Sequence, residues 1–191
     1  MDLYCASEVQ IGSIGSSFMA GSFFGSFILP RAADVIGRKP MFLTGLVIFM
    51  GVVITSLFCK NLYLVYFLLF MGGISETGRY YVAYVYLVEF MPIKLQNSAG
   101  LYIFVVFGFV MTYIAMQFWF LIKYWQINAA IALVLALASL ILTVVWLPES
   151  ARFYYGRKRF REAAAVMTKI AQTNLGKTLQ FEFRAETQLE N

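Results

Sequence analysis

The sequence predicts an all-α membrane protein with about five transmembrane helices, followed by a cytosolic helical segment. Of its 191 residues, 61% are hydrophobic and 13% are charged, whereas typical soluble domains have about 45–50% and about 25%. A soluble fold of this size has too small an interior to hide so many apolar side chains. The apolar residues also recur in several long runs, so one cleaved signal peptide does not account for them.

Four uncharged runs have the length of about 20 residues that an α-helix needs to cross a bilayer. They predict spans over about 9–30, 40–59, 97–122 and 126–147. A further span is predicted over about 62–91, although Glu76 and Arg79 interrupt it. The run FLTGLVIFMGVVITSLF lacks the alternating polarity of barrel strands, so helices are expected throughout. We therefore expect a transmembrane bundle over 1–149.

A short charged turn is predicted between the first two spans. Pro30 predicts the end of one helix and Pro40 the start of the next. Between them, Gly37 permits a tight turn, and Asp34 either caps the second helix or accepts a hydrogen bond from a neighbouring cation.

The segment 150–191 is predicted to be cytosolic and helical. Apolar residues at helical spacing predict a surface helix from about Arg157 to Thr173, with Gly176 as its stop signal. We expect this helix to lie against the bundle or the lipid headgroups.

Lysine and arginine are distributed unequally between the two sides of the predicted bundle. One side carries Lys60 and Lys123 with the acidic N-terminal residues, and the other carries 12 basic residues. The excess of positive charge marks the cytosolic side, so the N-terminus is predicted outside and the tail in the cytosol. Because the net charge of +5 comes from such connections, we expect a lipid bilayer as partner and no nucleic acid. The 12 residues are Arg31, Arg38, Lys39, Lys94, Arg152, Arg157, Lys158, Arg159, Arg161, Lys169, Lys177 and Arg184.

The composition leaves little room for metal or nucleophilic chemistry. The chain has two cysteines and no histidine, which removes the common His/Cys zinc sites and the Ser-His and Cys-His pairs. We therefore expect no enzyme, no metal and no cofactor. Cys5 and Cys59 fall on the same predicted side, either as two thiols or as a bridge.

Glu76 and Arg79 are the sharpest candidates for a functional site. They lie 10–13 residues before Glu89, which places them roughly 15–20 Å from the cytosolic end of the span. A charge at that depth costs at least about 2.5–3.5 kcal/mol on insertion scales, so it usually faces a cavity or a partner. Their spacing places them on one helix face. They are either a self-neutralising pair that fixes packing or a contact for a solute.

Other polar and aromatic residues occur in the same spans. Tyr80 and Tyr86 lie close to this pair in sequence, and Gln117 is a polar residue in the fourth span. Each can line a cavity or can pack against helices and lipid. In the first span, small residues recur every four positions and predict close helix packing. They are Ser13, Ser17, Gly21 and Gly25.

The turn PRAADVIGRKP resembles the signature loop of the major facilitator superfamily. In that family a glycine leads into Asp-Arg-x-Gly-Arg-Arg/Lys between the second and third helices. Pro30 stands in place of the leading glycine and Val35 in place of the first arginine. The matching residues are Asp34, Gly37, Arg38 and Lys39.

Three further stretches resemble the sugar porter and organic ion transporter branches. VEFMPIKLQNSAG is similar to Glu-x-x-Pro-x-x-x-Arg-Gly, with Glu89 and Pro92 matching. LPESARFYYGRKRFREA is similar to the Pro-Glu-Ser-Pro-Arg stretch after the sixth helix. MDLYC resembles the residues that precede the second helix in organic cation transporter relatives. The matches in the stretch after the sixth helix are Pro148, Glu149, Ser150 and Arg152.

The resemblance covers about 1–175 and equates the five spans with helices two to six of a twelve-helix fold. It implies that helix one and the second half lie outside this chain, with substrate held between the halves. It also implies alternating-access transport of a small organic solute, a sugar or an organic ion. The partner is then a missing second transporter half or another membrane subunit. The alternative is a non-transporting membrane subunit or scaffold that keeps the half-fold.

The resemblance implies two sets of functional residues. The substrate cavity set is Glu76, Arg79, Tyr80, Tyr86 and Gln117. The cytosolic latch set is Asp34, Gly37, Arg38, Lys39, Glu89, Glu149 and Arg152.

Overall fold

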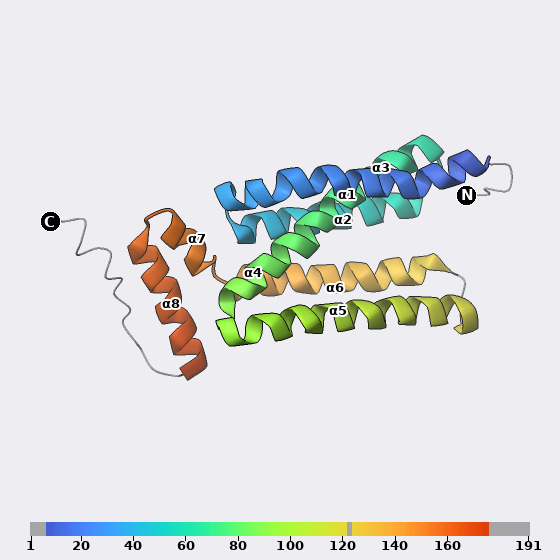
Figure 1. Ribbon diagram of the computed structural model, residues 1–191. Coiled ribbons are helices and arrows are strands. Elements are labelled where there is room, and N and C mark those ends of the chain that lie inside the picture. The colour runs from blue at the N-terminus through green and yellow to red at the C-terminus, as the bar shows by residue number, and fades with distance from the viewer. Residues whose placement is uncertain (1–6, 122–123, 176–191) are drawn as a thin grey trace.

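The computed structural model describes residues 7–121 and 124–175, and every regular element in these residues is a helix (Figure 1). This confirms the all-α class. Two short π-helical turns, η2 and η3, interrupt the long helices. The elements are α1 Glu8–Ile36, α2 Arg38–Phe58, α3 Leu62–Thr77, η2 Gly78–Val82, α4 Ala83–Phe90, α5 Ile93–Met116, η3 Gln117–Leu121, α6 Trp125–Val145, α7 Ala151–Gly156 and α8 Phe160–Leu175.

Four helices among the described residues are long and apolar enough to cross a membrane. They are α1, α2, the helix Ile93–Phe120 and α6. The remaining predicted span is a composite of α3, η2 and α4, which follow one another without a break over 62–90. At about 1.5 Å per residue this composite is roughly as long as α1. The π-turn and the charged residues set it apart from the other four.

The predicted end of the first helix at Pro30 is wrong, because α1 continues to Ile36 and α2 starts at Arg38. Proline removes one backbone hydrogen bond and normally kinks or ends a helix. Here Ala33, one turn further on, is buried in a small core with Met41 and Val82. Tertiary packing therefore sustains the helix, and the predicted loop shrinks to Gly37 alone.

Other helix boundaries also differ from those predicted. α5 begins at Ile93, directly after Pro92, and not near residue 97. The tail forms two helices, because the turn after Gly156 separates α7 from α8. The predicted stop at Gly176 and the Cys5 partner of the optional bridge lie outside the described residues.

Small residues allow α1 and α3 to pack closely. A Cβ atom added to Gly21 would overlap the backbone carbonyl of Phe70, and one added to Gly73 would overlap that of Phe18. Across this interface the Thr77 hydroxyl donates to the Ser22 carbonyl at 3.3 Å. The small-residue stripe predicted in the first span is thus a packing surface at its Gly21 and Gly25 positions.

The connections gather at two ends of the bundle. In Figure 1, the α1–α2 turn, the α4–α5 turn and the end of α6 lie at the same end as α7 and α8, while α1 begins at the opposite end. Charged residues of α1, α2, α4 and the segment after α6 meet at the end next to α7.

Candidate functional site

The first candidate site is a network of charged residues at the end of the bundle next to α7. We name it the end clasp and define it as Asp34, Gly37, Arg38, Lys39, Glu89 and Glu149. These residues come from α1, the α1–α2 junction, α2, α4 and the segment after α6.

Arg38 joins three helices within the end clasp. Its guanidinium lies 2.9 Å from the carboxylate of Asp34, one turn back across the α1–α2 junction, and 3.3 Å from that of Glu89 on α4. The side chains of Arg38 and Glu89 are 14% and 4% exposed, whereas that of Asp34 is 68% exposed. The Arg38–Glu89 pair is therefore the buried and less screened half of this network.

Glu149 caps the start of α2, and Lys39 caps the end of α6. One Glu149 carboxylate oxygen accepts hydrogen bonds from the backbone N–H groups of Arg38 at 3.1 Å and Lys39 at 3.2 Å. These donors belong to the first turn of α2, where N–H groups lack helical partners and the helix dipole favours negative charge. In the opposite direction, the Lys39 ammonium donates to the carbonyl of Leu147 at 2.6 Å and to that of Val144 at 3.3 Å, beside the C-terminus of α6.

Gly37 is required by the geometry of the clasp. Its φ of 127° lies in the region that favours glycine. A Cβ atom at this position would also lie 2.6 Å from a Glu149 carboxylate oxygen. Any larger residue would displace the carboxylate that caps α2.

Arg152, the remaining member of the predicted latch, stays at the edge of the clasp. Its backbone N–H donates to the Ser150 hydroxyl at 3.2 Å, which caps α7. Its side chain lines a second cavity of about 500 Å³, together with Glu89 and Tyr155. The structure thus brings six of the seven predicted latch residues together and leaves Arg152 beside them. That they act as a latch stays a prediction.

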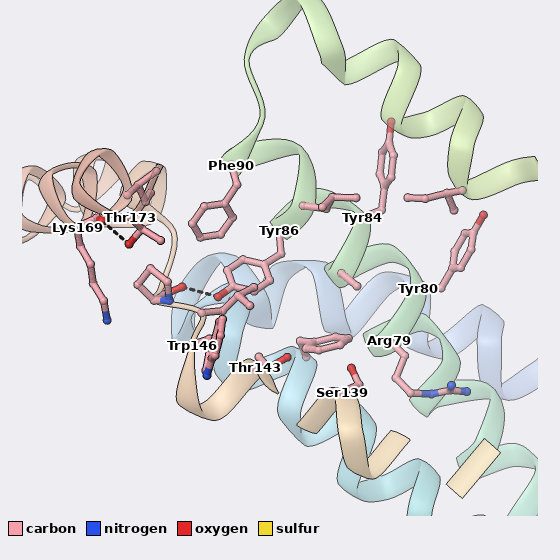
Figure 2. A pocket seen from close by; sticks show the side chains of 17 residues that line it. Arg79, Tyr80, Tyr84, Tyr86, Phe90, Ser139, Thr143, Trp146, Lys169 and Thr173 are labelled. Atoms are coloured by element: carbon pink, nitrogen blue, oxygen red, sulfur yellow. Dashed lines mark hydrogen bonds between the residues drawn. The ribbon is translucent and has the colours of Figure 1, made fainter. Parts of the chain in front are cut away.

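The second candidate site is a cavity of about 670 Å³ between α4, α5, α6 and α8 (Figure 2). Of the predicted cavity residues, Arg79, Tyr80 and Tyr86 line it. Glu76 and Gln117 lie outside it. That any of the five contacts a solute stays a prediction.

Arg79 and Glu76 turn toward different helices. Arg79 lies on the π-turn η2, and its guanidinium stacks over the Phe49 ring of α2 at 3.7 Å from the ring centroid. The Glu76 carboxylate instead accepts a hydrogen bond from the Ser22 hydroxyl of α1 at 3.3 Å. The two side chains form no ion pair within 4 Å, although the Glu76 carboxylate still interacts electrostatically with the Arg79 guanidinium. The Arg79 Nε atom is buried and has no hydrogen-bond partner.

Tyr86 and Gln117 are both buried but in different surroundings. Tyr86 is 3% exposed, and its hydroxyl donates to the carbonyl of Pro148, which joins α4 to the end of α6. Gln117 lies in η3 and its side-chain oxygen has no hydrogen-bond partner in the described structure. Tyr86 therefore connects the cavity to the end clasp, and Gln117 does not.

Comparison with known proteins identifies the family. The family model for sugar (and other) transporters matches residues 2–188. The chain belongs to this family of membrane transporters. It is 25% identical to organic cation/carnitine transporter 2 of Homo sapiens over 178 residues, which are 91% of this chain and 31% of that protein. It is 28% identical to solute carrier family 22 member 16 of Xenopus laevis over 176 residues, 91% of this chain and 30% of that protein.

A third relative gives the same picture. The organic cation transporter-like protein of Drosophila melanogaster is 28% identical over 177 residues, 91% of this chain and 30% of that protein. The chain thus spans about a third of the length of the curated relatives it matches. The resemblance inferred from the motifs is confirmed. The chain corresponds to part of the length of these transporters.

Several residues of the candidate sites were not identified in the sequence analysis. Ser139, Thr143 and Trp146 of the α6 region and Lys169 of α8 also line the larger cavity. Ser139 and Thr143 are hydroxyl residues one turn apart in the otherwise apolar stretch 129–147, a signal that was available in the sequence. Nothing in the sequence links Lys169 to a residue such as Arg79, because α8 reaches the cavity only by tertiary folding.

Arg157 is a further residue near the clasp that the sequence analysis did not single out. Its guanidinium donates to the carbonyl of Val35 near the end of α1, and it lies 4.8 Å from the centroid of the buried Phe153 ring. Arg38 approaches the same ring at 5.6 Å. Phe153 therefore connects α7 to the clasp through two cations.

Proposed function

We propose that this chain forms part of a facilitator-type carrier that moves a small organic solute across a membrane by alternating access. The observation that carries the proposal is the cavity beside Arg79, Tyr80 and Tyr86, which adjoins a charged clasp at one end of the bundle. Family membership supports transport as the activity. The five spans correspond to helices two to six of the complete carrier.

In this proposal the cavity residues contact the solute and the end clasp holds one side closed. Arg79 supplies charge, Tyr80 and Tyr86 supply ring faces and hydroxyl groups, and Glu76 and Gln117 complete the set from outside the present cavity. The clasp ties α2 to α6 and α4, so its charged contacts must break before these helix ends separate. Arg152 joins the clasp when its neighbours rearrange.

The proposal includes an orientation and a partner. The clasp end faces the cytosol and the N-terminus lies outside, supported by the excess of lysine and arginine at the clasp end. The missing contacts come from a second transporter half, as the shared length of about a third of the relatives suggests. The chain takes part in transport and carries out no catalysis.

Uptake into proteoliposomes tests the proposal. The polypeptide is purified together with its partner half and reconstituted with a panel of labelled solutes, in which organic cations come first because two of the relatives are named for them. We expect uptake of at least one class that Arg79→Gln lowers and Arg161→Gln, on the exposed side of α8, leaves unchanged. Uptake that is equal with Arg79→Gln and Glu76→Gln would refute the cavity assignment.

A non-transporting membrane subunit or scaffold is the second candidate. The exposed apolar surface of α5, including Phe104 and Phe109, favours it, because such a surface suits a neighbouring membrane helix as well as lipid. The same reconstitution separates the two candidates. A scaffold would give no uptake of any solute while co-purifying with a membrane partner.

A further inference from the structure

Three consecutive cations form the junction between α7 and α8. We name Arg157, Lys158 and Arg159 the basic turn, and all three residues are exposed. The nearby Glu162 carboxylate pairs with Arg159. Three positive charges against this one negative charge leave the basic turn with a net charge of +2. Such a surface favours a partner that carries negative charge.

Lys158 adopts a backbone conformation that lysine rarely takes. Its φ is 59°, and among the described residues it is the one residue other than glycine with a positive φ. This conformation closes the end of α7, because the backbone N–H of Lys158 donates to the Tyr155 carbonyl at 3.0 Å and that of Arg159 to the Tyr154 carbonyl at 3.0 Å. Glycine or asparagine is the usual residue at such a helix end, since other side chains raise its energy. The lysine is therefore better explained by what its side chain contacts than by the turn itself.

The Lys158 ammonium has no partner within the described part of the chain. It forms no ion pair and no side-chain hydrogen bond there. The two arginines beside it are engaged. The Arg157 guanidinium donates to the Val35 carbonyl, and the Arg159 guanidinium donates to the Glu162 carboxylate at 2.8 Å. These contacts hold the turn in place and leave the lysine between them for a partner outside the chain.

The basic turn lies at the depth of the lipid headgroups. Val35, which accepts the Arg157 hydrogen bond, is in the last turn of α1, and α1 is long and apolar enough to cross a membrane. The 29 residues of α1 extend roughly 43 Å, which matches the about 40–45 Å of a bilayer with its headgroups. Figure 1 shows the α7–α8 junction at the same end of the molecule as the α1–α2 turn. The exposed Val35, Ile36 and Tyr155 near the turn suit the boundary between hydrocarbon and headgroups.

We propose that the basic turn binds the headgroups of anionic phospholipids in the bilayer that the chain spans, with the Lys158 ammonium in contact with lipid phosphate. A lysine near an anionic membrane surface is attracted to it, and the two anchored arginines add to that field. The contact reaches the end clasp through Phe153, whose ring centroid lies 4.8 Å from the Arg157 guanidinium and 5.6 Å from that of Arg38. Lipid bound at the turn therefore holds α7 against the clasp. This inference goes beyond transport and does not rest on the solute cavity.

Thermal unfolding of the full chain in nanodiscs tests this inference. Two bilayers are compared, phosphatidylcholine alone and a mixture with phosphatidylglycerol, and circular dichroism follows the unfolding midpoint. We expect the anionic bilayer to raise the midpoint by about 2–4 °C for each cation in contact. High salt should remove most of this rise, because it screens exposed charges. The two faces of a nanodisc have the same lipids, so the orientation of the chain does not affect the result.

Substitutions at Lys158 separate its charge from its backbone conformation. Lys158→Gly removes the ammonium and suits the positive φ, so we expect an unchanged or higher midpoint in phosphatidylcholine. Its rise in the anionic bilayer should be smaller by about 2–4 °C. Lys158→Asn should repeat this result with a second residue that tolerates the conformation, and Lys158→Arg should keep the rise. Lys60→Gln is the matched control, because it removes an exposed lysine at the opposite end of the bundle, and it should keep most of the rise.

Several outcomes would overturn the inference. No rise for the unsubstituted chain, or an equal rise for Lys158→Gly, would show that the turn does not bind anionic lipid. An equal loss in Lys60→Gln and Lys158→Gly would assign the rise to the net charge of the chain instead of the basic turn. An equal rise when inorganic phosphate is added to the phosphatidylcholine nanodisc would assign the site to a soluble phosphate compound. None of these outcomes bears on the proposed function, which uptake tests separately.

Discussion

The Glu149 carboxylate accepts hydrogen bonds from the backbone N–H of Lys39 at 3.2 and 3.3 Å, while the Lys39 ammonium donates to carbonyls at the end of α6. Glu149 thus accepts hydrogen bonds at the start of α2, to which Lys39 belongs. Lys39 donates hydrogen bonds at the end of α6, which Glu149 follows in the chain. Because a helix start is electropositive and a helix end electronegative, both contacts are favourable for the same reason. Separating α2 from α6 would expose both helix ends at once.

Removing the Glu149 carboxylate should destabilise the bundle. Glu149→Ala leaves the first N–H groups of α2 without their acceptor, so we expect a loss of about 1–2 kcal/mol in the free energy of unfolding. Thermal unfolding in detergent, followed by circular dichroism, measures the change. Glu162→Ala is the control, because among the described residues Glu162 pairs with the exposed Arg159 alone, and the substitution should cost less than about 1 kcal/mol. Equal effects of the two substitutions would contradict the capping role.

The two carboxylates around Arg38 should differ in their contributions. Glu89→Gln leaves a largely buried guanidinium with one exposed partner, and we expect a loss of about 3 kcal/mol. Asp34→Asn removes the exposed partner and should cost less than about 1 kcal/mol. A double-mutant cycle with Arg38→Gln measures both coupling energies. A larger coupling for Asp34 than for Glu89 would refute this order.

Close packing between α1 and α3 should make Gly73 intolerant of a methyl group. In Gly73→Ala the new Cβ atom meets the backbone of Phe18, which cannot move without shifting α1, so we expect destabilisation of about 1–3 kcal/mol. Gly51→Ala is the matched control, because nothing lies within 4 Å of a Cβ atom there. It should be neutral or stabilise α2 by up to about 1 kcal/mol. If the unfolding midpoints of both variants shifted in the same direction, this would contradict the packing argument.

The Tyr86 hydroxyl should stabilise the junction between α4 and the end of α6. Tyr86→Phe removes its hydrogen bond to the Pro148 carbonyl in a buried position, and we expect a loss of about 0.5–1.5 kcal/mol. Tyr102→Phe serves as control, since Tyr102 is 69% exposed. Hydrogen exchange at the start of α7 offers a local readout, and unchanged exchange there would show that this bond does not tie the two segments together.

Hydrophobic length and charge were sufficient to predict much of the fold. Uncharged runs of spanning length predicted the helices, because each is long enough for a bilayer irrespective of its partners. The helix end predicted at Pro30 was wrong, because proline weakens a helix only locally. The burial of Ala33, which supports the helix beyond it, cannot be predicted from local sequence. The π-turn at Gly78–Val82 carries no composition signal that separates it from an α-helix.

The candidate sites were predictable to different degrees. All six residues of the end clasp were named, because they lie in short motifs that resemble those of the family. The cavity was named only in part. Its α4 side was visible through Arg79 and the tyrosines, but Lys169 and Thr143 come from segments that only the tertiary fold brings together. Helical spacing placed Glu76 near Arg79, with which it interacts electrostatically, but could not predict its hydrogen bond from Ser22 of α1.

The π-turn η2 has a consequence for how the composite helix 62–90 is divided. A π-turn adds one residue to a helical turn, and each residue of an α-helix rotates the side chains by about 100°. The rotational phase of α4 therefore differs from that of α3: Gly73 and Thr77 meet α1, whereas Tyr86 and Glu89 meet α6 and α2. Deleting one residue of η2 would return the helix to a single phase and turn Tyr86 and Glu89 away from both partners. The extra residue of η2 thus sets which face of α4 carries the clasp and cavity residues, while α3 packs against both α1 and α2.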